Sequence, residues 1–162
     1  MEFKNKVQEE AYKKVEQWLP LIVGEDRMGK NGDDGFWVSE GSTFVYVRVL
    51  EWGKDDAVVR CLSWVTTGTK LTPELMHYLL NTNSRFIFGA FSIDDDGSIT
   101  FKHSIIASTM DKNEFKAAIK VVALSADEYD DEIISKFGGK SAVDELQEKS
   151  DKRDQQDSPS KL

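Results

Sequence analysis

The chain contains 162 residues, and its 29 acidic and 21 basic side chains give a formal net charge of −8. This length fits one domain, and a hydrophobic fraction of 40% is enough to form a core. The acid excess excludes a generic binder of nucleic acid or of an anionic membrane surface, because both classes need a basic face. Cys61 is the only cysteine, so an internal disulfide is excluded too. With no signal-peptide pattern at the N-terminus, we expect a cytoplasmic protein.

The first predicted element is a helix over residues 3–19. We expect Pro20 to end it, because the residue before a proline is disfavoured in helical geometry. Residues 24–35 are rich in glycine and lack periodicity, which predicts a mobile loop. The helix prediction depends on apolar residues that recur at spacings of three and four, with charged residues between them: Phe3, Val7, Ala11, Val15, Trp18 and Leu19.

Residues 36–67 show the composition of strands. A short apolar run at 36–38 precedes two longer runs at 43–52 and 57–65, which are rich in β-branched and aromatic residues. Residues 53–56 form the turn between the two long strands. Both faces of the 43–52 strand carry apolar side chains, and a slip of one residue would exchange the two faces, so the register is left open.

A short helix is predicted after Thr72, which is a suitable N-cap, with Pro73 at the first helical position and an end at residues 81–83. Residues 86–93 and 98–106 then form a hairpin, because Asp96-Gly97 is a strong signal for a tight turn. The expected buried side of the short helix comprises Leu75, Met76, Leu79 and Leu80.

The last predicted helix begins at Asp111, with Glu114 three residues later as in a capping box, and ends at Gly138. Residues 141–162 are predicted to be a charged, disordered tail after a folded domain of residues 1–140, with one further helical turn allowed at residues 144–146. The resulting order α-β-β-β-α-β-β-α predicts an α+β fold, in which an antiparallel sheet is flanked by helices.

One motif suggests a nucleotide site. Gly24, Gly29 and Lys30 have the spacing of a phosphate-binding loop, but Asn31 replaces the magnesium-binding Ser or Thr. The residues after it do not favour a helix, and their carboxylates would repel a phosphate. We therefore interpret residues 24–35 as an ordinary loop and keep a nucleotide- or metal-dependent enzyme as the alternative hypothesis.

Other candidate chemistry is weak. Residues 94–97 lack the ligands that an EF-hand calcium loop requires at its first and last positions, so a hairpin turn is the better interpretation. The acidic cluster at 127–132 is typical of a solvated helix face, with a patch for a basic partner as the alternative. His77, His103 and Cys61 do not form a recognisable triad or zinc motif. We expect no catalytic residue, metal site or cofactor.

A surplus of strand aromatics suggests a binding surface instead. Each long strand also contains an internal arginine, so at least one face of the sheet is expected to meet water or a partner. Such a face can receive an extended peptide or a second copy of the chain. The candidate partner-binding residues are Tyr46, Arg48, Trp52, Arg60 and Trp64.

The second half of the chain resembles the YbjN-type family, which is similar in fold to type III secretion chaperones, including the Tir chaperone class. The resemblance covers roughly residues 37–139 and implies an antiparallel α+β fold, often dimeric, that binds protein segments without catalysis. The matching motifs are Leu79-Leu80-x-x-Asn83, Gly89-Ala90-Phe91-x-Ile93-Asp94-x-Asp96-Gly97-x-Ile99, Ala126-Asp127-x-Tyr129-Asp130 and Phe137-Gly138-Gly139.

The leading hypothesis is therefore a non-enzymatic module, chaperone- or adaptor-like, that binds a protein or peptide segment and forms a homodimer. No nucleic acid and no membrane is expected as a partner. Two alternatives stay open at this point: the nucleotide- or metal-dependent enzyme that uses residues 24–35, and a structural subunit of a larger assembly.

Overall fold

The computed structural model describes residues 2–32 and 35–145. Its elements follow one another in the order α1 (Lys6–Val23), a short 3-10 helix η1 (Glu25–Arg27), β1 (Met28–Asn31), β2 (Gly35–Glu40), β3 (Thr43–Trp52), β4 (Asp56–Thr67), α2 (Pro73–Asn83), β5 (Ala90–Ile93), β6 (Ile99–Ile106), α3 (Lys112–Phe137) and β7 (Lys140–Ser141). Residues 142–145 are helical.

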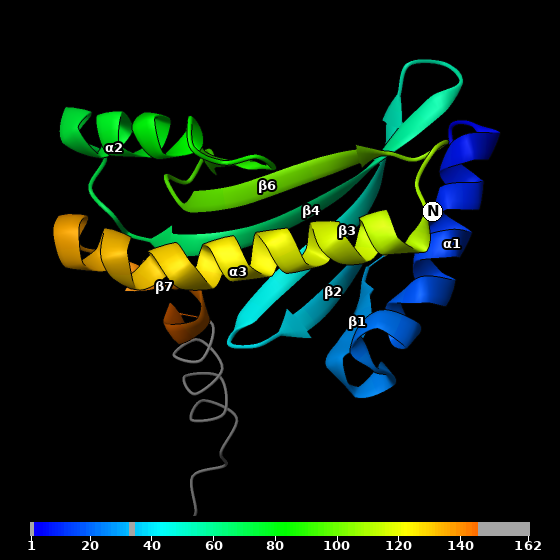
Figure 1. Cartoon of the computed structure of the whole chain (residues 1–162), viewed down its shortest axis with the longest axis horizontal. Coiled ribbons are helices and arrows are strands. Elements are labelled where there is room, and N and C mark those ends of the chain that lie inside the picture. The colour runs from blue at the N-terminus through cyan, green and yellow to red at the C-terminus, as the bar shows by residue number, and fades with distance from the viewer. Residues whose placement is uncertain (1, 33–34, 146–162) are drawn as a thin grey trace, which may run out of the picture.

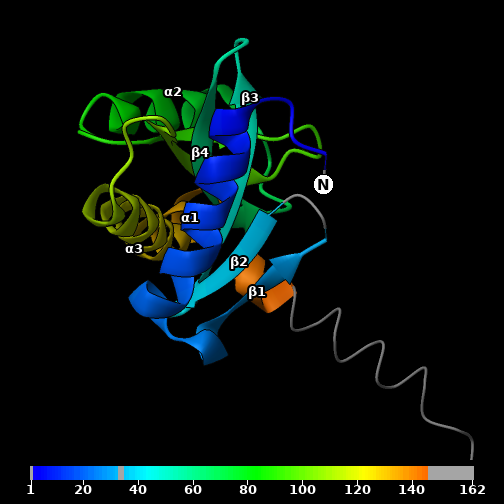
Figure 2. The same ribbon diagram turned by 90° about the vertical axis from the view of Figure 1, so that its right-hand side faces the viewer.

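The strands form one antiparallel sheet in the order β1-β2-β3-β4-β6-β5, and β7 pairs with the end of β4. Helix α3 runs along the length of this sheet, and α1 lies beside the strands at one end (Figure 1). A view turned by 90° places α2 and α3 on the same side of strands β3 and β4 (Figure 2). The fold is therefore α+β with an antiparallel sheet, as the sequence predicts.

The core lies between the sheet and the helices. Alternate residues of β3, namely Val45, Val47 and Val49, are fully buried, and the stripe of α3 that includes Phe115 and Ile119 covers them. Helix α1 packs on the same side, because Tyr12 contacts Phe36 of β2 and Trp18 contacts Phe115, with ring centroids 5.1 Å and 6.4 Å apart. Adjacent strand residues point to opposite faces, so the other set of β3 side chains faces away from the helices.

Local capping signals place the helix ends as predicted. The side chain of Thr72 accepts a hydrogen bond from the Leu75 amide at 3.2 Å, and that of Asp111 accepts one from the Glu114 amide at 2.8 Å. Gly138 ends α3 with a φ of 76°, a conformation that glycine adopts without steric cost. The 94–97 hairpin turn is also confirmed, with the Asp94 amide bonded to the Ser98 carbonyl.

Pro20 does not end the first helix. Helix α1 continues to Val23, and Gly24, with a φ of 92°, follows as its C-cap. The proline removes one backbone donor, but Leu19 and Val23 are buried in the core, and this packing holds the last turn in helical geometry.

Three further expectations need correction. Within the predicted loop at 24–35, residues 25–31 are not irregular, because they form η1 and the edge strand β1. Leu80 is not on the buried side of α2, since 71% of its side chain is exposed. Residues 141–145, assigned to the tail from the sequence, extend the fold: Ser141 ends β7, and the helical turn allowed at 144–146 begins earlier, at residue 142. The prediction of disorder for residues 146–162 lies outside the described residues.

Candidate functional site

The candidate site is the face of the sheet opposite the helices, which we call the open face. It is built by side chains of β2, β3, β4 and β6 that alternate with core residues, and these side chains are partly or largely exposed. Its main members are Trp37, Phe44, Tyr46, Arg48, Leu50, Trp52, Val58, Arg60, Leu62, Trp64, Lys102, Ser104 and Ile106.

Strand pairing arranges these side chains in rows across the sheet. One apolar row contains Leu50, Val58 and Ile106, which oppose one another on β3, β4 and β6. The adjacent row contains Arg48, Arg60 and Ser104, and the next contains Tyr46, Leu62 and Lys102. A cationic row therefore lies between two rows that carry apolar or aromatic residues.

An aromatic cluster occupies one end of the open face. The rings of Tyr46 and Trp64 meet edge to face at 4.9 Å, and those of Trp37 and Phe44 meet at 6.2 Å. The Trp37 indole lies over Gly29 of β1, where an added Cβ would come within 2.6 Å of it. The lack of a side chain at Gly29 therefore allows the Trp37 indole to pack closely against the backbone of β1. At the other end, Trp52 is 54% exposed and Ile106 is 43% exposed.

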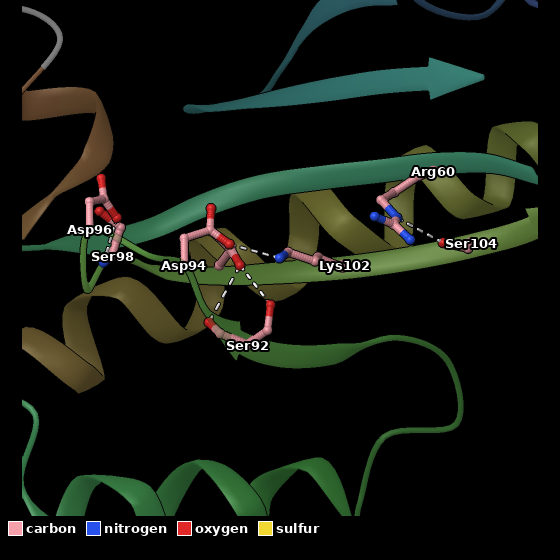
Figure 3. Close-up of polar contacts among 8 residues, drawn as sticks. Arg60, Ser92, Asp94, Asp96, Ser98, Lys102 and Ser104 are labelled. Atoms are coloured by element: carbon pink, nitrogen blue, oxygen red, sulfur yellow. Dashed lines mark hydrogen bonds and ion pairs between the residues drawn. The ribbon is translucent and has the colours of Figure 1, made fainter. Parts of the chain in front are cut away.

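The two arginines of the central row lean toward different neighbours. Gly35 opposes Arg48, and an added Cβ there would lie 3.1 Å from Arg48 Cγ, so the stem of Arg48 extends over β2. Arg60 donates from Nε to the Ser104 hydroxyl at 3.4 Å, on the other side of the row (Figure 3). The two side chains thus extend toward different strands although their Cα atoms are paired.

The β5–β6 side of the open face is polar. Lys102 pairs with Asp94 at 2.7 Å, and the hydroxyls of Ser92 and Thr100 lie 2.8 Å apart. Figure 3 shows Arg60, Lys102 and Asp94 on the side of the strands away from α3. The open face therefore carries apolar and aromatic rows with one arginine row over β3 and β4, and it becomes polar toward β5.

The structure places the five residues predicted as partner-binding on one face of the sheet, with Tyr46 and Trp64 in contact and Trp52 at the opposite end. Tyr46, Arg48 and Trp52 alternate on β3, and Arg60 and Trp64 do so on β4, all on the open face. Sequence reasoning missed Trp37, Leu62, Lys102 and Ile106. Their strand character was visible, but the pairing that carries them to the same face was not.

The geometry does not support a phosphate-binding loop at residues 24–35. Lys30 is followed by a turn and strand β2, whereas a phosphate loop must lead into a helix. Its ammonium group pairs with Glu16 of α1 at 2.7 Å, and this hydrogen bond raises the pKa of Lys30. This ion pair therefore connects the edge strand β1 to α1.

Cys61 and His103 are cross-strand partners, but on the helix-covered face. Complete burial raises the pKa of the Cys61 thiol to about 12, so the thiolate needed for nucleophilic attack is not formed near neutral pH. Burial also lowers the pKa of His103. Among residues 2–32 and 35–145, no group of three or more His, Cys, Asp or Glu side chains is placed to hold a metal ion.

A comparison with protein-family models matches residues 9–145 to the family described as T3SS (YopN, CesT) and YbjN peptide-binding chaperone 1. This match spans most of the chain. The protein belongs to this peptide-binding chaperone family. The matched range includes the whole of β1–β7 and so covers the entire open face.

The fold of this family member is also similar to a chain in the crystal structure of the ExsC–ExsE complex, with a TM-score of 0.50 and 14% sequence identity. The similarity covers 74% of this chain and 92% of that one. A comparison with curated proteins gives no match. In the part of the chain that the structure describes, no helix is both long and apolar enough to cross a bilayer.

Proposed function

We propose that the protein is a non-enzymatic, chaperone- or adaptor-like module that binds a segment of a partner protein on the open face. The observation that carries this proposal is that helices α1, α2 and α3 pack on only one face of the sheet. The opposite face presents aromatic and aliphatic side chains across several strands, and such surfaces are typical of peptide recognition. Membership in a peptide-binding chaperone family supports the same function.

The contact residues of the proposal are Tyr46, Arg48, Trp52, Arg60 and Trp64. Tyrosine and tryptophan offer large apolar contact at a low entropic cost, and arginine adds directional hydrogen bonds, which is why these types are enriched in binding hot spots. Their side chains share one face, so a single bound segment can contact several of them.

Titration of isotopically labelled protein with a library of unfolded segments tests this site. Binding segments should shift the signals of Tyr46, Trp52, Arg48 and Arg60, and Trp64→Ala should weaken binding about tenfold or more, as for a hot-spot aromatic residue. Leu124→Ala is the matched control, because Leu124 is an exposed apolar residue of α3, 64% exposed, away from the open face. Segments that bind without shifting the open-face signals would contradict the site.

We propose in addition that the protein is a homodimer, formed through the segment that joins α2 to β5. Ile87 and Phe88 are exposed there, Ile87 by 88%, and Leu80 in the last turn of α2 is exposed too. Beside this segment, residues 103–106 of β6 extend beyond the last β5 pair, Ala90 with Lys102, and their outer edge pairs with no strand among the described residues. An unpaired edge next to exposed apolar residues favours association.

Sedimentation analysis tests the dimer. The unmodified chain should have twice the monomer mass, and Ile87→Asp should dissociate it, because a desolvated carboxylate in the interface is unfavourable. Leu21→Asp, at an exposed apolar residue of α1, should leave the dimer intact. A monomeric unmodified protein would refute this proposal and leave the peptide-binding proposal in place.

A further inference from the structure

The central row of the open face is electrostatically unusual. Arg48 and Arg60 occupy directly opposed positions on β3 and β4, and like charges in such positions destabilise a sheet. The whole chain has a net charge of −8, so acidic residues that could neutralise a cationic row are plentiful in the sequence. A row of arginines on an exposed face of an acidic protein is suited to attract an anionic group of a partner.

Arg60 is the cation of this row whose charge is available. Among the described residues its polar contact is the Ser104 hydroxyl at 3.4 Å, and it forms no ion pair with any of them. The next cation on the open face, Lys102, is held by Asp94 at 2.7 Å. A carboxylate that approaches the open face would therefore meet Arg60 without displacing an internal partner.

The residues around Arg60 indicate which side chains can flank that carboxylate in a bound segment. Val58 and Leu62 lie two residues before and after Arg60 on the same face of β4. The row of Val58 is aliphatic, and the row of Leu62 continues with the aromatic ring of Tyr46 on one side and with Lys102 on the other. Same-face side chains of a strand are about 6.6–6.8 Å apart. An extended segment that lies along β4 repeats its own side chains at the same interval, so its residues i, i+2 and i+4 match the three rows.

We propose that the open face selects extended segments in which an acidic side chain lies between two apolar ones, at i+2 between i and i+4, and that Arg60 binds the carboxylate. This inference rests on the proposed peptide-binding function and specifies its ligand. The planar guanidinium group can donate two parallel hydrogen bonds to a carboxylate, which gives direction as well as attraction. The apolar neighbours bury the flanking side chains and reduce the exposure of the ion pair to water.

Two capped peptides that differ in one atom group test the proposal. One contains Leu-Thr-Glu-Thr-Phe within a polar flank, and the other has Gln in place of Glu. Calorimetry should show the Glu peptide binding about fivefold to tenfold more tightly, as expected for a charge-assisted hydrogen bond that is partly exposed. The preference should decrease between about 0.05 M and about 0.5 M salt, because salt screens exposed charges.

Arg60→Gln should reduce this preference to less than about twofold, whereas Lys116→Gln, at an exposed lysine of α3, should preserve it. Arg60 is exposed, so its replacement leaves the core unchanged. Equal affinity of the two peptides, or a preference that survives Arg60→Gln, would overturn the inference while leaving the proposed function intact. Binding of neither peptide, nor of any segment of the library, would overturn both.

Discussion

The two faces of strands β3 and β4 share one backbone, but they differ in side-chain size, exposure and charge. On the helix-covered face, Val45, Val47, Val49 and Val59 are fully buried. On the open face, the same strands carry aromatic rings and two arginines that remain partly or largely exposed. Compact β-branched side chains allow helices to pack closely on a sheet, while long amphipathic ones cover apolar surface and still contact water. The comparison separates residues that pack in the core from residues that remain accessible at the surface.

The largest expected difference between the two faces is in the effect of a substitution on the free energy of unfolding. Phe101→Ala, on the helix-covered face of β6, should lower the free energy of unfolding by about 3–5 kcal/mol, because it leaves a cavity among fully buried residues. Trp52→Ala, on the open face, should change it by no more than about 0.5 kcal/mol. Urea unfolding measures both variants. Similar losses for the two would show that the open face contributes to the core.

A smaller effect is expected where the covering helix begins. Asp111→Ala removes the side chain that accepts a hydrogen bond from the Glu114 amide at 2.8 Å, so it should lower the free energy of unfolding by about 1 kcal/mol. Asp95→Ala, at an exposed position of the 94–97 turn, is the matched control and should be nearly neutral. Peptide affinity should stay unchanged in both, because α3 lies on the other side of the sheet. A weakened affinity for Asp111→Ala would place part of the site on the helix-covered face.

The smallest effect concerns pH. Burial lowers the pKa of His103 below the value of about 6.5 that an unfolded chain has, although Glu114 acts in the opposite direction. Below that unfolded-state value the unfolded chain binds more protons than the folded one, so folding stability decreases as pH falls. Melting temperatures measured from pH 7.5 to pH 5.5 should therefore decline, and His103→Gln should flatten that decline. His77→Gln, at an exposed histidine of α2, should not flatten it.

Local chemistry made much of the fold predictable. Thr72, Asp111 and Gly138 mark helix ends because caps act within one turn, and Gly97 marks a hairpin turn for the same local reason. The edge strand β1 was missed, since Met28–Asn31 has none of the β-branched residues that indicate a strand and depends on its pairing with β2. The helix end predicted at Pro20 was wrong because the preference against helix before a proline considers only neighbouring residues. Contacts with distant core residues hold Leu19 and Val23 in α1.

The sequence by itself determined the single-domain α+β class, the resemblance to a peptide-binding chaperone family and the two alternating sets of side chains on β3 and β4. Each of these depends on residue type and short spacing, which are present in the chain before it folds. Only the tertiary structure decided which set the helices cover, that Arg48 opposes Arg60, and that Trp37, Lys102 and Ile106 share their face. Register and helix placement depend on contacts between residues far apart in the chain. The net charge of −8 therefore could not reveal the cationic row at the centre of the open face.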